Sequence, residues 1–132
     1  MIDCLILGDS IAVGTQQFRP ECALYAKSGV NSFQWNRQNA KKGLNARTVI
    51  ISLGSNDHAN IRTLWELQQL RTRVDADKVF WILPAIKPEI QSIVYAVAKD
   101  YGDTVLPIEN LRDDGVHPNW SGYRKLAAQT KK

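Results

Sequence analysis

The sequence IDCLILGDSIAVGT, residues 2–15, joins a compact apolar run to a helical pattern through a glycine turn. Residues 2–7 show little polar alternation, which is typical of a strand buried on both faces. The turn that follows is small and polar, and residues 10–18 fit a short helix. A buried strand followed by a helix predicts the first unit of a parallel α/β sheet.

The same alternation continues to the end of the chain. Further strands are predicted at residues 22–27, 47–54, 78–85 and 104–108, and further helices at 31–44, 60–74, 88–102 and 119–132. This pattern predicts a flavodoxin-like three-layer α/β/α sandwich with a five-stranded parallel sheet. The length of 132 residues, with no linker or repeat, predicts a single domain over residues 1–132.

The composition is that of an ordinary globular protein, with 44% hydrophobic and 23% charged residues. The formal net charge of +4 favours acidic partners or substrates through long-range attraction. The basic residues are scattered along the chain, so no nucleic-acid partner is expected. The apolar runs are strand-sized, so no membrane-spanning helix is expected either.

The N-terminal residues 1–10 have no basic segment before their apolar run, and that run is too short for a signal peptide. The chain is therefore expected to be cytoplasmic as translated, either free-standing or as a component of a larger assembly such as a phage particle. No preferred oligomer follows from the sequence. Cys4 and Cys22 have no metal-binding spacing, and Cys4 falls inside an apolar strand, so a buried thiol is expected there.

Small, polar or titratable residues follow four of the predicted strands. These loops contain Gly8-Asp9-Ser10, Ser28-Gly29-Val30, Gly54-Ser55-Asn56-Asp57-His58 and the segment 113–118. Loops after parallel strands gather at the carboxyl edge of the sheet, where such folds build their sites. We therefore expect these four loops to lie together.

Ser10 has several interpretations within its stretch. The phosphate-binding pattern Gly-x-x-x-x-Gly-Lys-Ser/Thr is absent, because five residues separate Gly8 from Gly14 and no lysine follows. The stretch is not the Gly-x-Ser-x-Gly elbow of the α/β-hydrolases, because Ala12 replaces the second glycine. Ser10 could cap the following helix or serve as a nucleophile, and these two roles are compatible.

A nucleophile needs a base and donors for an oxyanion. In DDGVHPNWSG, His117 follows Asp114 by three residues, so one loop can present a carboxylate and an imidazole. The N–H of Gly29 and the side-chain amide of Asn56 are candidate donors, although Gly29 could simply form a turn and Asn56 could cap a helix.

The four groups together resemble the SGNH hydrolases, or GDSL-type esterases. The resemblance covers nearly the whole chain and rests on Gly8-Asp9-Ser10-x-x-x-Gly14, Gly29, Gly54-x-Asn56-Asp57 and Asp114-x-x-His117, in the family's order. By this resemblance, Ser10 is the nucleophile, His117 the general acid–base and Asp114 the residue that orients His117. The N–H groups of Ser10 and Gly29 and the Asn56 amide would form the oxyanion hole.

The resemblance implies a serine ester hydrolase that acts on small acyl esters, such as O-acetyl or short-chain acyl groups, with carbohydrate esters among the candidates. It implies no cofactor and no metal. His58 and Trp120 are candidates for the substrate rim. Two alternatives stay open: a non-catalytic flavodoxin-like ligand-binding module, and an acyltransferase that uses the same residues.

Overall fold

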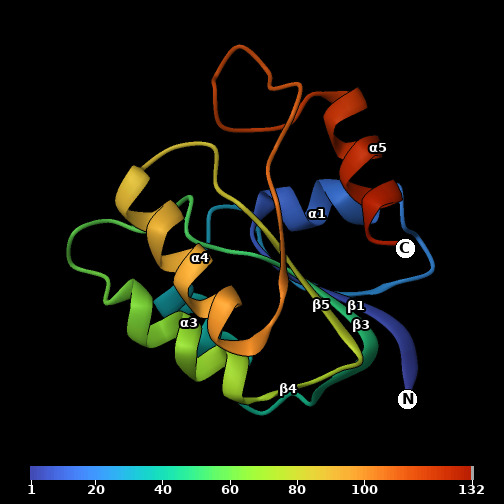
Figure 1. Ribbon diagram of the computed structural model, residues 1–132, viewed down its shortest axis with the longest axis vertical. Coiled ribbons are helices and arrows are strands. Elements are labelled where there is room, and N and C mark those ends of the chain that lie inside the picture. The colour runs from blue at the N-terminus through green and yellow to red at the C-terminus, as the bar shows by residue number, and fades with distance from the viewer. Residues whose placement is uncertain (132) are drawn as a thin grey trace.

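The structure, a computed structural model that describes residues 1–131, is built on a parallel β-sheet with helices on both faces (Figure 1). The strand order is β2-β1-β3-β5-β6, with a short β4 paired to β3 outside this path. The strands are β1 (Ile2–Gly8), β2 (Ala23–Ala26), β3 (Leu44–Ser52), β4 (Val74–Asp75), β5 (Lys78–Ile82) and β6 (Thr104–Leu106). The predicted α/β fold with a parallel sheet is confirmed, and only the two-residue β4 was not anticipated.

The helices divide between the two faces of the sheet. They are α1 (Ser10–Gln16), α2 (Ser32–Gln38), α3 (Thr63–Thr72), α4 (Pro88–Tyr101) and α5 (Trp120–Gln129). Apolar side chains of α1 and α5 pack with one face, and those of α2, α3 and α4 pack with the other. The helix α2 ends earlier than predicted because Leu44 already begins β3, and α3 begins later because a turn at 58–61 precedes it.

Alternating residues of the central strands supply both halves of the core. In β1, Leu5 and Leu7 join the cluster under α2, α3 and α4, whereas Cys4 and Ile6 join the cluster under α1 and α5. All four side chains are buried. Burial on both faces explains why the strand sequences lack polar alternation.

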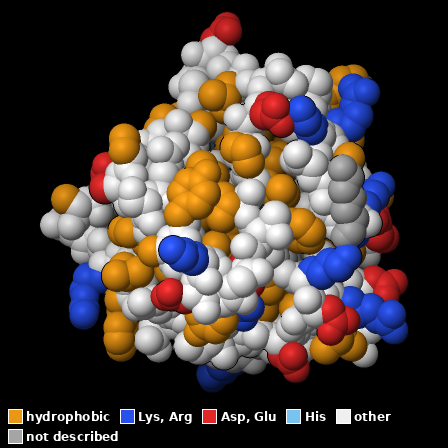
Figure 2. All heavy atoms as spheres, in the orientation of Figure 1, with side chains coloured by type: hydrophobic (Ala, Val, Ile, Leu, Met, Phe, Trp, Pro, Cys, Tyr) orange, Lys and Arg blue, Asp and Glu red, His pale blue; other side chains and the backbone are white. Residues whose placement is uncertain are grey.

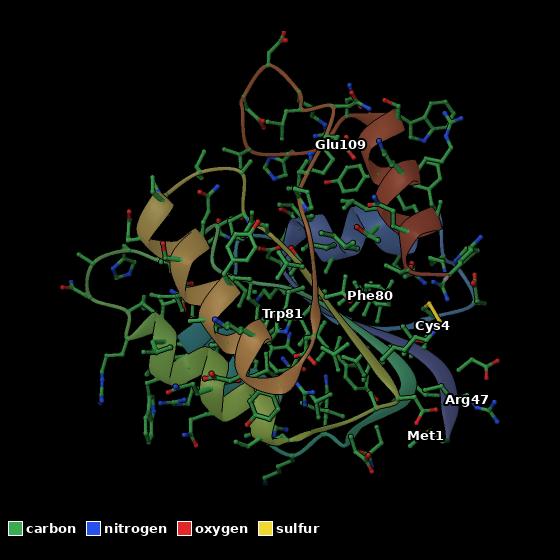
Figure 3. The ribbon with its side chains drawn as sticks, viewed as in Figure 1. Met1, Cys4, Arg47, Phe80, Trp81 and Glu109 are labelled. Atoms are coloured by element: carbon green, nitrogen blue, oxygen red, sulfur yellow. A yellow bond between two sulfur atoms is a disulfide. The ribbon has the colours of Figure 1, made fainter. Side chains whose placement is uncertain are left out.

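Cys4 and Cys22 form a disulfide, so the prediction of a thiol at Cys4 is wrong although both residues are buried. The parallel pairing of β1 with β2 sets Leu5 opposite Ala23. One step earlier in the same register, Cys4 and Cys22 face each other with a Cα–Cα distance of 4.8 Å. Spacing along the chain could not reveal this pairing, because it depends on the strand register. Figure 3 places Cys4 well away from the loop that carries Glu109.

Reduction of this disulfide is expected to lower the free energy of unfolding by about 3 kcal/mol, because the bond closes a loop over 18 residues in the unfolded chain. Urea unfolding with and without reductant measures the change. A Cys4→Ala/Cys22→Ala double variant is the control and should not respond to the reductant. Equal midpoints for the wild-type protein under both conditions would contradict the prediction.

The surface of the described residues is mixed in character. In Figure 2, apolar side chains lie near the centre and along the left margin of this face, and acidic and basic side chains lie close together at its lower right. Within residues 1–131, none of the helices combines the length and the apolar character needed to cross a bilayer.

Candidate active site

The turn after β1 places Ser10 at the first residue of α1. Gly8 has φ +138°, and a Cβ there would lie 1.9 Å from the carbonyl oxygen of Ser52, so only glycine fits this approach to β3. Asp9 is the N-cap of α1: its Oδ1 accepts a hydrogen bond from the N–H of Ile11 at 3.0 Å. Asp9, and not Ser10, therefore caps the helix, which leaves the Ser10 hydroxyl free for another partner.

Asp9 is fully buried beside Ser10. Its Oδ1 also accepts from the Ser52 hydroxyl at 3.1 Å, whereas its Oδ2 has no hydrogen-bond partner within residues 1–131. Desolvation by burial raises the pKa of Asp9 from 3.8 to about 6, against the lowering effect of its hydrogen bonds.

The raised pKa of Asp9 predicts that the free energy of unfolding depends on pH. The folded state binds this proton more tightly than the unfolded state, so stability is retained below pH 4 and lost as pH rises through about 6. Relative to Asp9→Asn, the wild-type free energy of unfolding should fall by about 3 kcal/mol between pH 4 and 7. Chemical denaturation of both proteins at several pH values tests this. A difference that stays constant with pH would refute the shift.

Ser10, His117 and Asp114 form one chain of hydrogen bonds. Ser10 Oγ lies 2.9 Å from His117 Nε2, and His117 Nδ1 lies 2.7 Å from Asp114 Oδ2. A carboxylate can only accept, so Nδ1 carries the proton and Nε2 accepts from the serine hydroxyl. The structure thus brings Ser10 into contact with His117, 107 positions further along the chain, and His117 with Asp114, three positions before it.

Asp114 is held by its own loop. Its Oδ1 accepts from the backbone N–H groups of His117 and Val116, both at 2.9 Å. These two bonds, followed by the bond to the imidazole, lower the pKa of Asp114 to about 2. The exposed carboxylate is therefore ionised at neutral pH.

The loop between β6 and α5 is closed by backbone bonds at its base. Arg112 N–H donates to the carbonyl of His117 at 2.8 Å, and Asn119 N–H donates to that of Asn110 at 2.8 Å. Asn119 also caps α5 by accepting from Gly122 N–H. Figure 1 shows this segment arching past α1 and α5. Its short hairpin base fixes the direction in which His117 points.

Asn56 lies in the loop after β3, with its side chain exposed. Its Nδ2 donates to the carbonyl of Val30 at 3.0 Å, which links this loop to the Gly29 turn after β2. One of its two amide hydrogens makes this bond, and the other is available to a ligand. Asn56 does not cap α3, whose N-cap is Arg62.

Gly29 has φ +82° in the turn between Lys27 and Val30, and its Cα faces open space. The Lys27 N–H donates to the carbonyl of Gly8 at 3.0 Å, so this turn begins beside the Ser10 turn. The two bonds of Lys27 and Asn56 bring the loops after β1, β2 and β3 to one edge of the sheet.

Two residues that sequence reasoning missed support the Asn56 loop. The buried carboxylate of Asp57 accepts from the backbone N–H and hydroxyl of Ser32, at 2.9 and 2.5 Å, and from the Thr63 hydroxyl at 2.8 Å. Lys87, with an unusual φ of 64°, donates from Nζ to the carbonyls of Ser55 and Asp57, at 2.9 and 2.6 Å. Asp57 is part of the Gly54-x-Asn56-Asp57 motif, but the sequence assigned it no role. Nothing in the sequence singles out Lys87.

A cavity of about 530 Å³ opens beside the hydroxyl of Ser10. Ser10 and His117 line it together with residues of α1, α5 and the β6–α5 loop, among them Arg112, Trp120 and Tyr123. Trp120 is 71% exposed, as a rim residue would be. His58 lines a different cavity, and its Nδ1 accepts from Asn60 N–H in a local turn.

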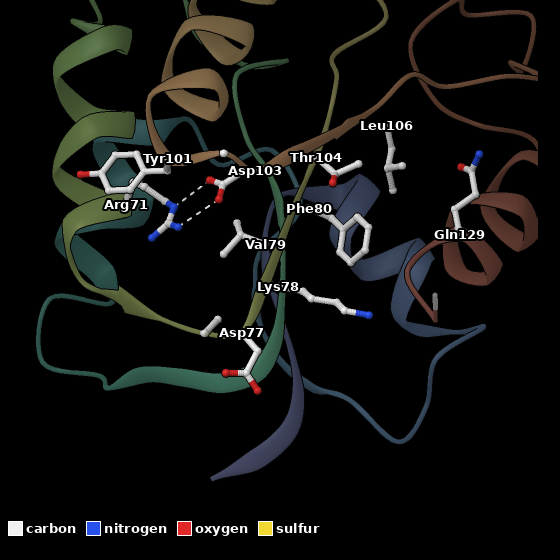
Figure 4. A pocket seen from close by; sticks show the side chains of 12 residues that line it. Arg71, Asp77, Lys78, Val79, Phe80, Tyr101, Asp103, Thr104, Leu106 and Gln129 are labelled. Carbon is white, nitrogen blue, oxygen red and sulfur yellow. Dashed lines mark hydrogen bonds and ion pairs between the residues drawn. The ribbon is translucent and has the colours of Figure 1, made fainter.

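A second cavity, of about 590 Å³, lies near the amino end of β5 (Figure 4). Two charged residues of its lining form an ion pair: Arg71 Nε and Nη2 donate to the Asp103 carboxylate at 2.7 and 3.0 Å. Trp81 Nε1 also donates to Asp103 at 2.9 Å. No serine or histidine lines this cavity, whereas Ser10 and His117 lie at the opposite, carboxyl end of the strands.

Neither a family model nor a curated protein sequence matches the chain. Several solved structures, however, do match it. A protein from Bacteroides fragilis described as an acylhydrolase aligns over 96% of this chain and 83% of its own, with 18% identity and a TM-score of 0.71. A protein from Parabacteroides merdae described as a GDSL-like lipase aligns over 96% and 92%, with 14% identity and a TM-score of 0.73.

The catalytic domain of peptidoglycan O-acetyltransferase A from Streptococcus pneumoniae, solved with a methylsulfonyl adduct, aligns over 98% of this chain and 90% of its own. The identity is 17% and the TM-score 0.59. At such identities the likeness establishes the fold. The chain therefore shares the fold of these acylhydrolase-like and GDSL-like structures.

Proposed function

We propose that this protein is a serine ester hydrolase that cleaves small acyl esters, most favourably O-acetyl or short-chain acyl groups, through an acyl-enzyme on Ser10. The observation that carries the proposal is the hydrogen-bonded chain from Ser10 through His117 to Asp114, which opens onto a cavity. Serine, a base and an orienting carboxylate in this order are what acyl transfer needs.

In the first step, the Ser10 oxygen attacks the ester carbonyl while His117 Nε2 removes the hydroxyl proton. The carbonyl π pair moves onto oxygen, where the N–H groups of Ser10 and Gly29 and the Asn56 amide are the proposed donors. Asp114 stabilises the imidazolium that forms. When the tetrahedral intermediate collapses, the bond to the leaving oxygen breaks, the imidazolium protonates that oxygen, and the alcohol departs from the acyl-enzyme.

In the second step, His117 removes a proton from water, and the water oxygen attacks the acyl-enzyme carbonyl. A second tetrahedral intermediate forms on the same donors and expels the Ser10 oxygen, which recovers its proton from His117. The free carboxylic acid is the product. Both steps use the same three side chains, and neither calls on a metal.

A panel of p-nitrophenyl acetate, butyrate and octanoate tests the proposal. A preference for small acyl groups predicts that kcat/KM falls as the acyl chain lengthens. Turnover that increases toward the octanoate would contradict the small-acyl assignment. Absence of turnover in a folded protein would favour the ligand-binding alternative.

A second candidate is acyl transfer to a carbohydrate hydroxyl, which is favoured by the fold shared with the O-acetyltransferase domain. The residues and the acyl-enzyme would be the same, and the acceptor alone would differ. Product analysis with and without oligosaccharide acceptors separates the two activities. Acetate as the sole product in the presence of acceptors supports hydrolysis.

Asn56→Ala is expected to lower kcat by about 10²–10³-fold, because it removes one side-chain donor from the oxyanion. Asn60→Ala, a change of an exposed asparagine four residues away, is the matched control and should leave kcat unchanged. Steady-state kinetics on p-nitrophenyl acetate measure both. Equal kcat values for the Asn56→Ala and wild-type proteins would remove Asn56 from the oxyanion hole.

The disulfide also bears on where the protein works. A buried Cys4–Cys22 bond is typical of proteins that function in oxidising surroundings or on particle surfaces. We propose that the protein is made in the cytoplasm and acts outside it, which fits the alternative of a component of a phage particle better than a cytoplasmic role.

A further inference from the structure

We propose that the cavity beside Ser10 selects esters whose alcohol part carries a carboxylate, and that Arg112 binds this carboxylate. The favoured substrate class is an O-acylated sugar acid. The inference rests on the proposed hydrolase function and adds to it the chemical class of the alcohol. It follows from three features of the cavity: its position relative to His117, the unpaired guanidinium of Arg112, and the groups beside it.

The position of the cavity assigns it to the alcohol. His117 must protonate the leaving oxygen, so the alcohol part of the ester lies on the His117 side of Ser10. The cavity is lined by Ser10 and His117 but by neither Asn56 nor Gly29, the proposed side of the carbonyl oxygen. Its volume of about 530 Å³ falls in the range of small-molecule sites.

Arg112 brings an uncommitted positive charge to this cavity. Its side chain makes no hydrogen bond or ion pair within residues 1–131. Arg71, by contrast, forms an ion pair with the Asp103 carboxylate. Its backbone N–H is bonded to the carbonyl of His117 at 2.8 Å, so the residue is fixed across the hairpin from the imidazole. The planar guanidinium offers paired N–H donors that match a carboxylate.

Tyr123 and Trp120 complete the surroundings of this charge. The Arg112 guanidinium lies 5.9 Å from the centre of the Tyr123 ring. The Tyr123 hydroxyl has no partner within the described chain and lies against Gly14, where a Cβ would come within 2.8 Å of it. The exposed Trp120 ring lies on the rim. The Arg124 guanidinium lies 5.4 Å from the centre of this ring. A flat ring beside a cation and a hydroxyl suits a carboxylated sugar.

The nearby negative charges do not cancel Arg112. Asp114 is engaged by His117 and by two backbone N–H groups, and Asp9 is buried under α1. Glu109 is paired with Lys125 at 2.8 Å. Asp113 is exposed in the same loop. Arg112 is therefore the basic side chain lining this cavity that a substrate anion would meet without displacing a protein carboxylate.

The test compares two acetate esters that differ only in charge: an O-acetylated methyl glucuronoside with its free carboxylate, and the same compound as the neutral carboxamide. We expect wild-type kcat/KM for acetate release to favour the acid by about 10- to 100-fold. Arg112→Gln should bring this ratio close to one. Arg47→Gln removes the same charge from an exposed position far from this loop, and it should leave the ratio unchanged.

The outcomes separate this inference from the proposed function. A wild-type ratio near one, a ratio that survives Arg112→Gln, or an equal loss in Arg47→Gln would overturn the role of Arg112 while hydrolysis itself stands. If neither ester is cleaved and p-nitrophenyl acetate is not cleaved either, the hydrolase assignment fails and this inference falls with it.

Discussion

Ser10→Ala should abolish ester hydrolysis, lowering kcat by about 10⁶-fold on the scale of other serine hydrolases. The reason is covalent: without the hydroxyl there is no nucleophile in hydrogen-bond contact with His117 Nε2, 2.9 Å away in the native site. The fold should persist, because Asp9 and not Ser10 caps α1. Burst and steady-state kinetics on p-nitrophenyl acetate measure the loss.

The matched control for this change is Ser92→Ala, an exposed serine of α4 outside the cavity. It should keep wild-type turnover and the same thermal unfolding temperature. Substantial turnover by a folded Ser10→Ala protein would show that water is activated directly or that another residue attacks the ester. Either result would end the acyl-enzyme mechanism.

Asp114→Asn is expected to lower kcat by as much as about 10⁴-fold with little change in stability. An asparagine Oδ1 can still accept from Val116 and His117 N–H, so the turn survives. Its amide nitrogen, however, donates to His117 Nδ1 and forces the proton onto Nε2, where it faces Ser10 and cannot accept. Because the pKa of Asp114 is about 2, the native carboxylate is charged at any pH near neutrality.

Asp113→Asn is the control for this second change, since it alters the neighbouring exposed carboxylate without touching His117. It should leave kcat unchanged. Full activity in Asp114→Asn would mean that Ser10 and His117 act as a pair without an orienting carboxylate. Thermal unfolding of both variants distinguishes a catalytic loss from a loss of fold.

The parallel sheet and its helices could be predicted because each element carries its own periodic signal. Residues 49–52 of β3 are all buried and show no polar alternation, and α4 begins with Pro88 and is capped at its C-terminus by Gly102. The meeting of the loops follows from topology, since the carboxyl ends of parallel strands share one edge. Ser10, Asp114 and His117 therefore met as expected, although their roles stay predictions.

What the sequence could not reveal depends on distances across the fold. The Cys4–Cys22 bond requires the register of β1 with β2, and the Lys87 contacts require a left-handed backbone that no local pattern marks. The same holds for Asp9: a serine and an aspartate both suit a helix cap, and only the structure shows that Asp9 accepts from Ile11 N–H and from the Ser52 hydroxyl. The cavity beside Arg112 likewise arises from α1, α5 and one loop together.

The central claim is that Ser10 is the nucleophile, and covalent labelling tests it most directly. The folded protein is treated with a fluorophosphonate, and the modified residue is located by peptide mass spectrometry. The account predicts a single adduct on Ser10, absent from Ser10→Ala and much slower to form in Asp114→Asn. An adduct on another residue, or no adduct in a folded protein, would contradict it.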